Sequence, residues 1–365
     1  MKSIAYNNKE LYWKRIQLIS FVLAVFIIIR HNSSIYNYDS PTILTIYEGF
    51  KYSITEIAVP LFFIISGFNY FNHFSITDQK RKFGNRIKSL LVPYLVWNTV
   101  FCVFCIITSS DFFSQFFIGR AKFVVTPLNV IWGCIFHMEC NSQFWFVFTL
   151  MVCVLINPLI YYVIRNKYTG GAFLIVLYVG IMLFGFKLPS YYFYRTDAFL
   201  YYYIGAFLGL HYNQLFMENN SHIGKLNKIS PLKKIISSNA YYIITGAICM
   251  FFSLFLLIPN LHEGIRVILI LLASYGFWRV SCICRFFSFR WLPQGGTTFL
   301  MYAAHGIIQP VTVKLLYFLL PKYNWFSVIN FILAITITVL LCMAIRWVTK
   351  RYLPIVDKII TGWRR

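Results

Sequence analysis

The feature that most constrains this chain is a series of apolar runs, separated by short polar segments. Many of these runs reach the length of about 20 mostly apolar residues that an α-helix needs to cross the hydrocarbon core of a bilayer. Inside lipid, only helices and closed barrels satisfy all of their backbone hydrogen bonds. The runs therefore predict an all-α fold, a polytopic integral membrane helix bundle.

The composition agrees with a membrane protein and excludes three other classes. Of the 365 residues, 59% are hydrophobic and only 12% are charged, whereas soluble globular proteins carry about 25% charged residues. This excludes a soluble enzyme, a disordered chain and a disulfide-stapled secreted module. The nine cysteines lie mostly inside apolar runs without zinc-ligand spacing, so we expect buried packing and no metal site.

Ten ranges are predicted to be spanning helices, within a single membrane domain that covers residues 1–365 and has short cytoplasmic tails. A shorter apolar piece, 123–137, contains Pro127 and Gly133 and is predicted to be re-entrant or interfacial. The ten ranges are 16–35, 54–74, 88–108, 143–164, 170–187, 194–212, 238–258, 263–281, 296–320 and 325–349.

The net charge of +22 comes from Lys and Arg clustered between the apolar runs. This layout fits loops that face anionic lipid and cytoplasm, and we expect no nucleic acid partner. With both termini in the cytoplasm, 24 of the 33 Lys and Arg residues fall on the cytoplasmic side, as the positive-inside rule requires. The predicted location is therefore the plasma or inner membrane.

Ionisable side chains inside apolar runs are candidate functional residues, because placing a charge in a bilayer has a high free-energy cost. His31 ends the first run directly after Arg30. An imidazole can act as a general base near neutral pH, although a histidine that only marks a helix end is the alternative. His305 lies well inside the ninth range, where a hydrogen bond to a neighbouring helix is an equal alternative.

Further candidates lie near the ends of other ranges. Arg195 and Asp197 are two residues apart and cannot face each other on a straight helix, so each is expected to pair with another helix or to line a water-filled cavity. Glu139 precedes Trp145 at a span entrance, where an exposed loop is the alternative. Arg30, Glu139, Trp145, Arg195, Asp197 and His305 are therefore the candidates for a cavity or for acceptor binding.

A basic cluster precedes the third range, with Arg86 and Lys88 at its end. The positive-inside rule already explains such a cluster. The functional alternative is a phosphate anchor for a nucleotide-bearing donor, since Arg and Lys both bind phosphates well.

Several short sequence segments together resemble the acyltransferase-3 family. Members of this family are multi-pass membrane acyltransferases that modify cell-surface carbohydrates. The first is the apolar run that ends in His31, and the second is Pro60-Leu-Phe-Phe-Ile-Ile-Ser-Gly-Phe68. The others are the segment from Arg86 to Trp97, then Phe144-Trp-Phe146, and the pair Tyr302 and His305.

The resemblance implies transfer of an acyl group, usually acetyl from acetyl-CoA, to a sugar hydroxyl. It implies that His31 is the catalytic base and that Arg86 helps to hold the donor from the cytoplasmic side. The chain departs from the family at Ser20, where the family has an arginine 11 residues before the histidine. Arg15 lies about 24 Å from His31 along a helix, which is too far for contact. We expect Arg15 and Lys88 to contact the phosphates of the donor instead.

We therefore expect a membrane-embedded O-acyltransferase whose partners are lipid, acyl-CoA as the donor substrate, and a carbohydrate acceptor, with no bound cofactor. The acceptor is a cell-surface glycan or a lipid-linked sugar. The alternative is a transporter or flippase for a glycan or lipid precursor, in which Arg195, Asp197 and Glu263 line the path. A third interpretation, an inactive relative that acts as an assembly partner, gains support from Ser20.

Overall fold

The computed structural model describes residues 8–37, 40–110, 123–184, 196–213, 239–281, 293, 295–321 and 323–364. Within these residues all regular secondary structure is helical, as predicted. The α-helices are α1 (Asn8–Arg30), α2 (Pro41–Lys51), α3 (Ala58–Phe71), α4 (Gln79–Ser109), α6 (Trp145–Ile164), α7 (Lys167–Phe184), α8 (Asp197–His211), α11 (Asn239–Phe251), α12 (Glu263–Val280), α13 (Gly295–Leu319), α14 (Phe326–Tyr352) and α15 (Pro354–Thr361).

Shorter 3₁₀ and π segments complete the described structure. Three of them matter below: η2 (Ile54–Ile57) leads into α3, η5 (Ser142–Phe144) leads into α6, and η8 (Phe252–Leu257) extends α11. The range predicted to be re-entrant or interfacial contains the short π-helix η4 (Asn129–Phe136), which packs on α4.

A helix lies in each of the ten ranges predicted to span the membrane, but the count of ten is not confirmed. Among the described residues, six helical segments are both long and apolar enough to cross a bilayer: Tyr12–Arg30, Pro41–Phe71, Ile76–Ser109, Ser142–Ile164, Gly295–Leu319 and Phe326–Tyr352. Two further apolar helices, Lys167–Leu183 and Tyr241–Leu257, are shorter. Multi-pass membrane architecture therefore holds, while the number of spans stays a prediction.

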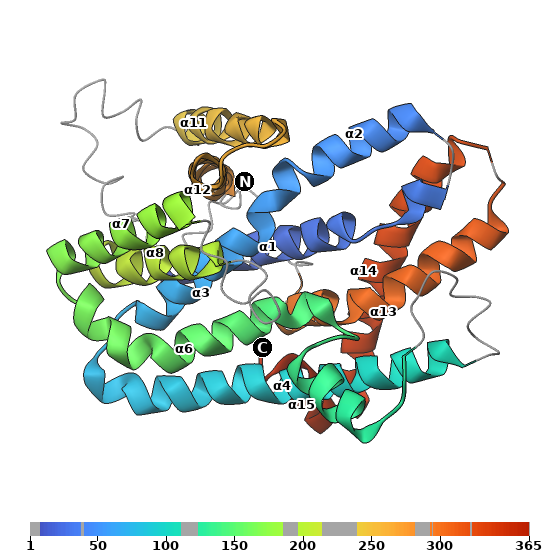
Figure 1. The fold of residues 1–365 in the computed structure, drawn as a ribbon, viewed down its shortest axis with the longest axis horizontal. Coiled ribbons are helices and arrows are strands. Elements are labelled where there is room, and N and C mark those ends of the chain that lie inside the picture. The colour runs from blue at the N-terminus through green and yellow to red at the C-terminus, as the bar shows by residue number, and fades with distance from the viewer. Residues whose placement is uncertain are drawn as a thin grey trace, which may run out of the picture.

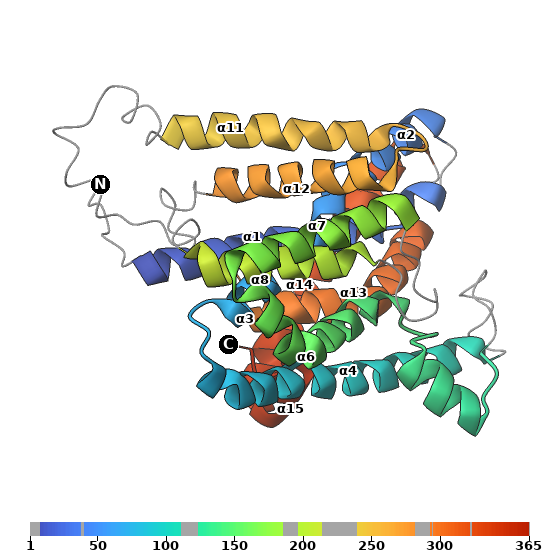
Figure 2. The ribbon, with the colours of Figure 1, turned by 60° about the vertical axis from the view of Figure 1, so that its left-hand side comes forward.

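Most helices run side by side along one direction, with α1 in the middle of the bundle (Figures 1 and 2). α1 packs against α3 and α13, α3 against α8, and α4 against α6. α11 and α12 form a pair on one flank, and Figure 2 shows the start of α1, the start of α11 and the end of α12 at the same end of the bundle. α1 therefore places its last turn, which precedes His31, at the opposite end.

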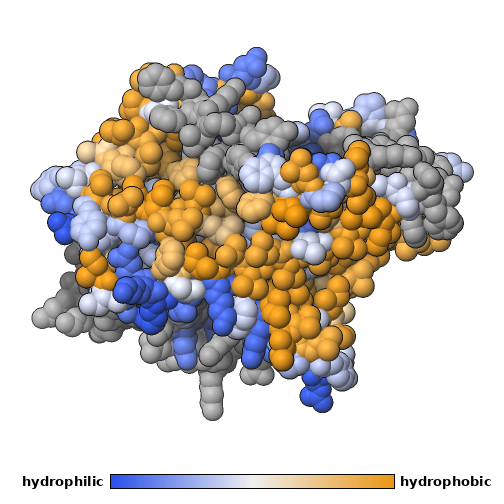
Figure 3. Space-filling view, turned by 60° about the horizontal axis from the view of Figure 1, so that its bottom comes forward, coloured by the Kyte–Doolittle hydropathy of each residue, from blue (hydrophilic) through white to orange (hydrophobic). Residues whose placement is uncertain are grey.

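The outer surface of the bundle is apolar over a broad area, as Figure 3 shows for the face that carries α4. On α4, exposed apolar side chains occupy one face at Leu91, Leu95, Val103 and Ile107, with Thr99 at the position between the two pairs. Residues four apart share one face of a helix. This stripe is exposed to whatever surrounds the bundle, which in a membrane protein is lipid.

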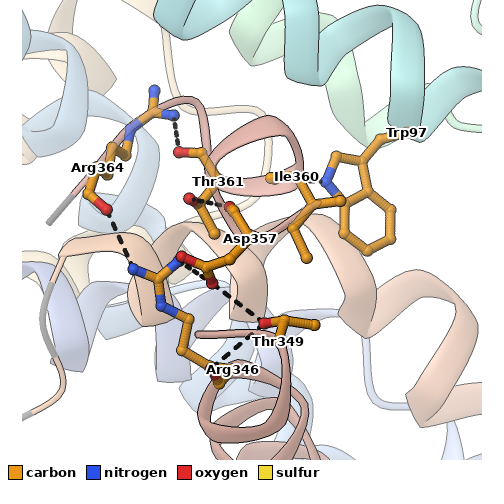
Figure 4. Close-up of polar contacts among 7 residues, drawn as sticks. All are labelled: Trp97, Arg346, Thr349, Asp357, Ile360, Thr361 and Arg364. Atoms are coloured by element: carbon orange, nitrogen blue, oxygen red, sulfur yellow. Dashed lines mark hydrogen bonds and ion pairs between the residues drawn. The ribbon is translucent and has the colours of Figure 1, made fainter. Parts of the chain in front are cut away.

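The short C-terminal helix α15 is held against α14 and α4 by polar contacts (Figure 4). Arg346 Nη1 lies 2.5 Å from Asp357 Oδ1, and both side chains are less than a tenth exposed. Arg346 Nη2 also donates to the backbone oxygen of Arg364, and Trp97 Nε1 donates to that of Ile360. Arg364 is thereby brought beside the start of α13, where its guanidinium lies 4.0 Å over the ring of Phe299.

The contact between α3 and α8 depends on glycines. A Cβ at Gly67 would overlap the backbone oxygen of Tyr202, and a Cβ at Gly205 would overlap that of Ile64. Small residues let membrane helices approach this closely. Because lipid tails are as apolar as the side chains, the hydrophobic effect does not drive helices together in a membrane, and close van der Waals packing stabilises their contact instead. Since residues at the start of α3 line the cavity described below, the α3–α8 contact supports the site.

We expect Gly205→Ala to lower the stability of the purified protein by about 1–3 kcal/mol, because the added methyl group overpacks the helix contact. Gly171→Ala is the matched control, since a Cβ at Gly171 in α7 meets no atom within 4 Å. That change should instead gain up to about 1 kcal/mol from helix propensity. Unfolding in mixed micelles measures both, and equal effects of the two variants would contradict the close approach.

Candidate active site

A cavity of about 290 Å³ lies at the end of α1 and takes in several of the residues predicted to be functional. His31, Arg30 and Trp145 line it, as do side chains from η2, α3, η5 and α13. His31 is exposed to this space, since it sits in the turn where α1 ends and its backbone N–H closes the last hydrogen bond to Ile27. The structure therefore places the predicted base at an open cavity.

One wall of the cavity is a buried ion cluster. The side chain of Glu56 is only 2% exposed, and its Oε1 lies 2.8 Å from Arg30 Nη1 and 3.0 Å from Arg266 Nη2. Arg30 Nη1 also donates to the backbone oxygen of Lys51. A buried carboxylate needs opposite charges and hydrogen bonds around it, and here the two guanidinium groups join α1, η2 and α12.

The opposite wall is formed by α13 and by the segment that leads into α6. The Tyr302 hydroxyl donates to the backbone oxygen of Gln143 at 2.6 Å, and Gln143 Nε2 donates back to the backbone oxygen of Ala303 at 3.3 Å. The Tyr302 ring lies 5.6 Å from that of Phe146. These contacts fix the amide of Gln143 and two aromatic rings at the cavity wall.

His305 lies behind this wall, fully buried in α13, with its ring centroid 5.2 Å from that of His31. Its Nδ1 lies 2.7 Å from the backbone oxygen of Tyr302. One turn further along α13, Gln309 Nε2 donates to the backbone oxygen of Ile28 at 2.8 Å. The last turn of α1 is therefore tied to α13, and this tie brings the two imidazoles together.

The surroundings of His31 favour its neutral form. Burial within the surrounding protein is the main cause that lowers the pKa of His31 below its ordinary value, and the electrostatic influence of His305 and of the cations Arg30 and Lys51 lowers it further. A neutral imidazole has one nitrogen that can accept a proton. At neutral pH, His31 is therefore in the protonation state that a general base requires.

The three residues predicted to bind a donor lie away from the cavity, in the early turns of α4 and α1. Lys88 is exposed, with its Nζ 4.3 Å over the ring of Trp363, and Arg86 is partly exposed in the same part of α4. Arg15 is only 4% exposed. Its Nε donates to Ser281 Oγ at 2.7 Å, and its guanidinium lies over the ring of Trp278.

Two other candidates, Glu139 and Asp197, do not line the cavity. The backbone N–H of Glu139 bonds to the oxygen of Gly133 in the turn after η4, and Asp197 begins α8. Arg195 lies outside the described residues. The structure thus brings together His31, Arg30, Trp145 and His305 from the predicted set.

Four residues at the site were not predicted to belong to it: Glu56, Arg266, Gln143 and Tyr302. A signal existed for the first two, because a carboxylate and a guanidinium within apolar runs each need a partner of opposite charge. Tyr302 had a different signal, its place beside His305 in the segments that resemble the family. For Gln143 the sequence carries no signal, since its role depends on contacts with the backbone of a distant segment. Within the described part of the chain, no cluster of three or more His, Cys, Asp or Glu side chains is arranged to hold a metal ion.

Comparison with known proteins identifies the family. The family model for the acyltransferase domain named Acyl_transf_3 matches residues 13–347, nearly the whole chain. No curated protein and no solved structure matches it. The matched range includes His31, His305 and every residue that lines the cavity. The chain belongs to the acyltransferase-3 family and is a membrane acyltransferase.

Proposed function

We propose that this acyltransferase moves an acyl group, acetyl in the expected case, from acyl-CoA to a hydroxyl of a cell-surface glycan or a lipid-linked sugar. The observation that carries the proposal is the placement of His31, a neutral imidazole that is open to a cavity large enough for a sugar hydroxyl and a thioester. The cavity walls offer the hydrogen-bonding groups of Gln143 and Glu56 beside the aromatic surfaces of Trp145 and Phe146. This mixture of polar and aromatic surface suits a sugar ring.

The acyl donor is proposed to enter at the basic end of the bundle, the end that carries Arg86, Lys88 and Arg364. Guanidinium and ammonium groups suit the phosphates of coenzyme A. Burial, and to a smaller extent the like charge of Arg86, lowers the pKa of Arg364. Positive charges held this close to one another favour the binding of a polyanion. Arg15 is less suited to this role, since its guanidinium is already held by Ser281 and Trp278.

In the proposed reaction, His31 removes the proton of the acceptor hydroxyl as its oxygen attacks the thioester carbonyl. The new C–O bond forms, the C–S bond breaks, and the proton held by His31 passes to the leaving sulfur, which departs as the free thiol of coenzyme A. His31 returns to its neutral form at the end of this cycle. The residues listed here supply proton transfer and positioning, and no further co-reactant is needed.

The first test replaces the proposed base. We expect His31→Ala to lower acyl transfer about 10²–10⁴-fold, the usual contribution of a general base. The measurement is the acyl content of surface glycans, determined by mass spectrometry in cells that express each variant at equal level. His137→Ala is the matched control, because it removes an imidazole that lies after η4 rather than at the cavity. Wild-type acylation by His31→Ala would rule out the proposed base.

A second prediction follows from the lowered pKa of His31. A base is active in its unprotonated form, so a lowered pKa keeps it active at more acidic pH. With an ordinary pKa of about 6.5, the imidazole would be about nine-tenths protonated at pH 5.5. We expect the rate of thiol release from acetyl-CoA by the purified protein, with a membrane glycan extract as acceptor, to change less than twofold between pH 7.5 and 5.5. A tenfold decline over this interval would contradict the assignment.

The third test concerns the donor. We expect Arg86→Ala to weaken the binding of acetyl-CoA about 10- to 150-fold, because one charge-assisted phosphate contact contributes roughly 1.5–3 kcal/mol. Isothermal titration calorimetry of the purified protein measures this directly. Arg165→Ala removes an equal charge from the exposed end of α6 and should leave the affinity unchanged. An equal loss in both variants would indicate general electrostatic attraction instead of a donor site.

A further inference from the structure

His305 has two ring nitrogens in different situations, although the side chain has no exposed surface. Nδ1 lies 2.7 Å from the backbone oxygen of Tyr302. Because a carbonyl oxygen can only accept, this contact requires the proton to be on Nδ1. In the neutral ring, Nε2 is then a hydrogen-bond acceptor. Within the described structure this buried Nε2 has no hydrogen-bond partner.

A buried acceptor without a partner costs about 1–3 kcal/mol. His305 Nε2 is one of several such atoms among the described residues, and its place beside the predicted base sets it apart. Nδ1 points back to the backbone of α13, and the ring centroid of His31 lies 5.2 Å from that of His305, with the two planes inclined by 46°. Hydrogen bonds between catalytic groups are often long in the free enzyme and tighten when substrate binds.

The other polar groups around His31 do not offer the same contact. Arg30, Lys51 and Arg266 are cations, which donate hydrogen bonds and cannot accept them. Glu56 is an acceptor, but its carboxylate is held between Arg30 and Arg266. His305 Nε2 is a buried acceptor in the described part of the chain that has no other hydrogen bond, and its ring lies beside that of His31.

We propose that His305 is a positioning residue for His31: its Nε2 accepts the N–H of the His31 imidazole and so fixes the tautomer whose other nitrogen faces the cavity. The nitrogen that faces the cavity then always carries the lone pair. When it takes the proton of an attacking hydroxyl, the imidazolium keeps its hydrogen bond to His305. The role in proton transfer rests on the function proposed above, whereas the hydrogen bond and the tautomer do not.

The hydrogen bond between His31 and His305 accounts for two features of the site. It gives a partner to the buried Nε2 of His305, and it orients a ring that would otherwise be free to rotate at the end of α1. Orientation of a histidine base by an acceptor behind it is the general logic of catalytic triads. Here the acceptor is neutral, so it adds no negative charge beside the cations Arg30 and Lys51.

The tautomer can be measured without turnover. The protein is labelled with ¹⁵N-histidine, placed in lipid bilayers at pH 7.5 and studied by solid-state NMR, with the His31 signals identified by their loss in His31→Ala. We expect a single neutral tautomer of His31 in the wild type and a mixture of both in His305→Met, which removes the acceptor. His305→Gln places an amide oxygen near the position of Nε2 and should restore the single tautomer. An unchanged single tautomer in His305→Met would overturn the proposal.

Kinetics supply the second measurement. In acyl transfer from acetyl-CoA, we expect His305→Met to lower kcat about 10²-fold with little change in KM, and His305→Gln to recover most of this loss. A residue that only fills space would not distinguish Met from Gln in this way. His211→Gln is the matched control, because His211 also bonds to a backbone oxygen, that of Ile164, far from the cavity. An equal loss in the Met and Gln variants would contradict the positioning role.

The two measurements separate the two proposals. If the tautomer responds to His305→Met while the wild type transfers no acyl group, the proposed function fails and the histidine pair stands. If the wild type transfers acyl groups and the tautomer does not respond, the pair fails and the function stands. Size-exclusion chromatography and circular dichroism in detergent identify a variant that does not fold, whether or not the protein binds acetyl-CoA. If His305→Met does not fold, His305→Leu, which also lacks an acceptor, replaces it in the tautomer measurement.

Discussion

The buried carboxylate of Glu56 is the interaction on which the cavity end of the bundle depends. Its two ion pairs connect the last residue of α1, the 3₁₀ turn before α3 and the first turn of α12. Removing one partner of such a buried cluster is strongly destabilising, about 3–5 kcal/mol, because a charge is left without compensation. Arg30 is therefore held next to the cavity, and with it the position of His31 one residue later.

The same requirement explains why the few polar groups of this bundle are informative. In an apolar environment each buried polar group must find a partner within the protein. Most do so here: Gln309 bonds to the backbone of α1, Asn157 bonds to the Tyr202 hydroxyl, and Arg346 pairs with Asp357. These contacts hold helices together. Several buried polar atoms of the described residues have no hydrogen-bond partner, Asn157 Oδ1 among them. The nitrogen of His305 differs from these in its place, since its ring lies beside that of His31, which lines the cavity.

The sequence predicted the helical membrane fold because hydropathy reports directly on the cost of exposing a backbone to lipid. It could not settle the number of spans, since α8, α11 and α12 are short or carry charges that hydropathy cannot place. His31 was recognisable because an imidazole at the end of an apolar run is costly. The ring pair of His31 and His305 was not, because it depends on how α1 and α13 pack, and their residues are far apart in the sequence.

The same limit applies to a row of aromatic rings on α13, because its neighbours come from distant parts of the sequence. Residues Phe299, Tyr302 and His305 recur every three positions, a spacing that places them on one face of α13, and their successive ring centroids are 6.0 and 6.3 Å apart. This row begins under the guanidinium of Arg364 and ends beside His31. One face of a single helix therefore connects the basic end of the bundle with the cavity. In the reaction proposed above, the donor holds its phosphates at the first and its acyl group at the second, and the six-residue separation of Phe299 and His305 corresponds to about 9 Å along the helix.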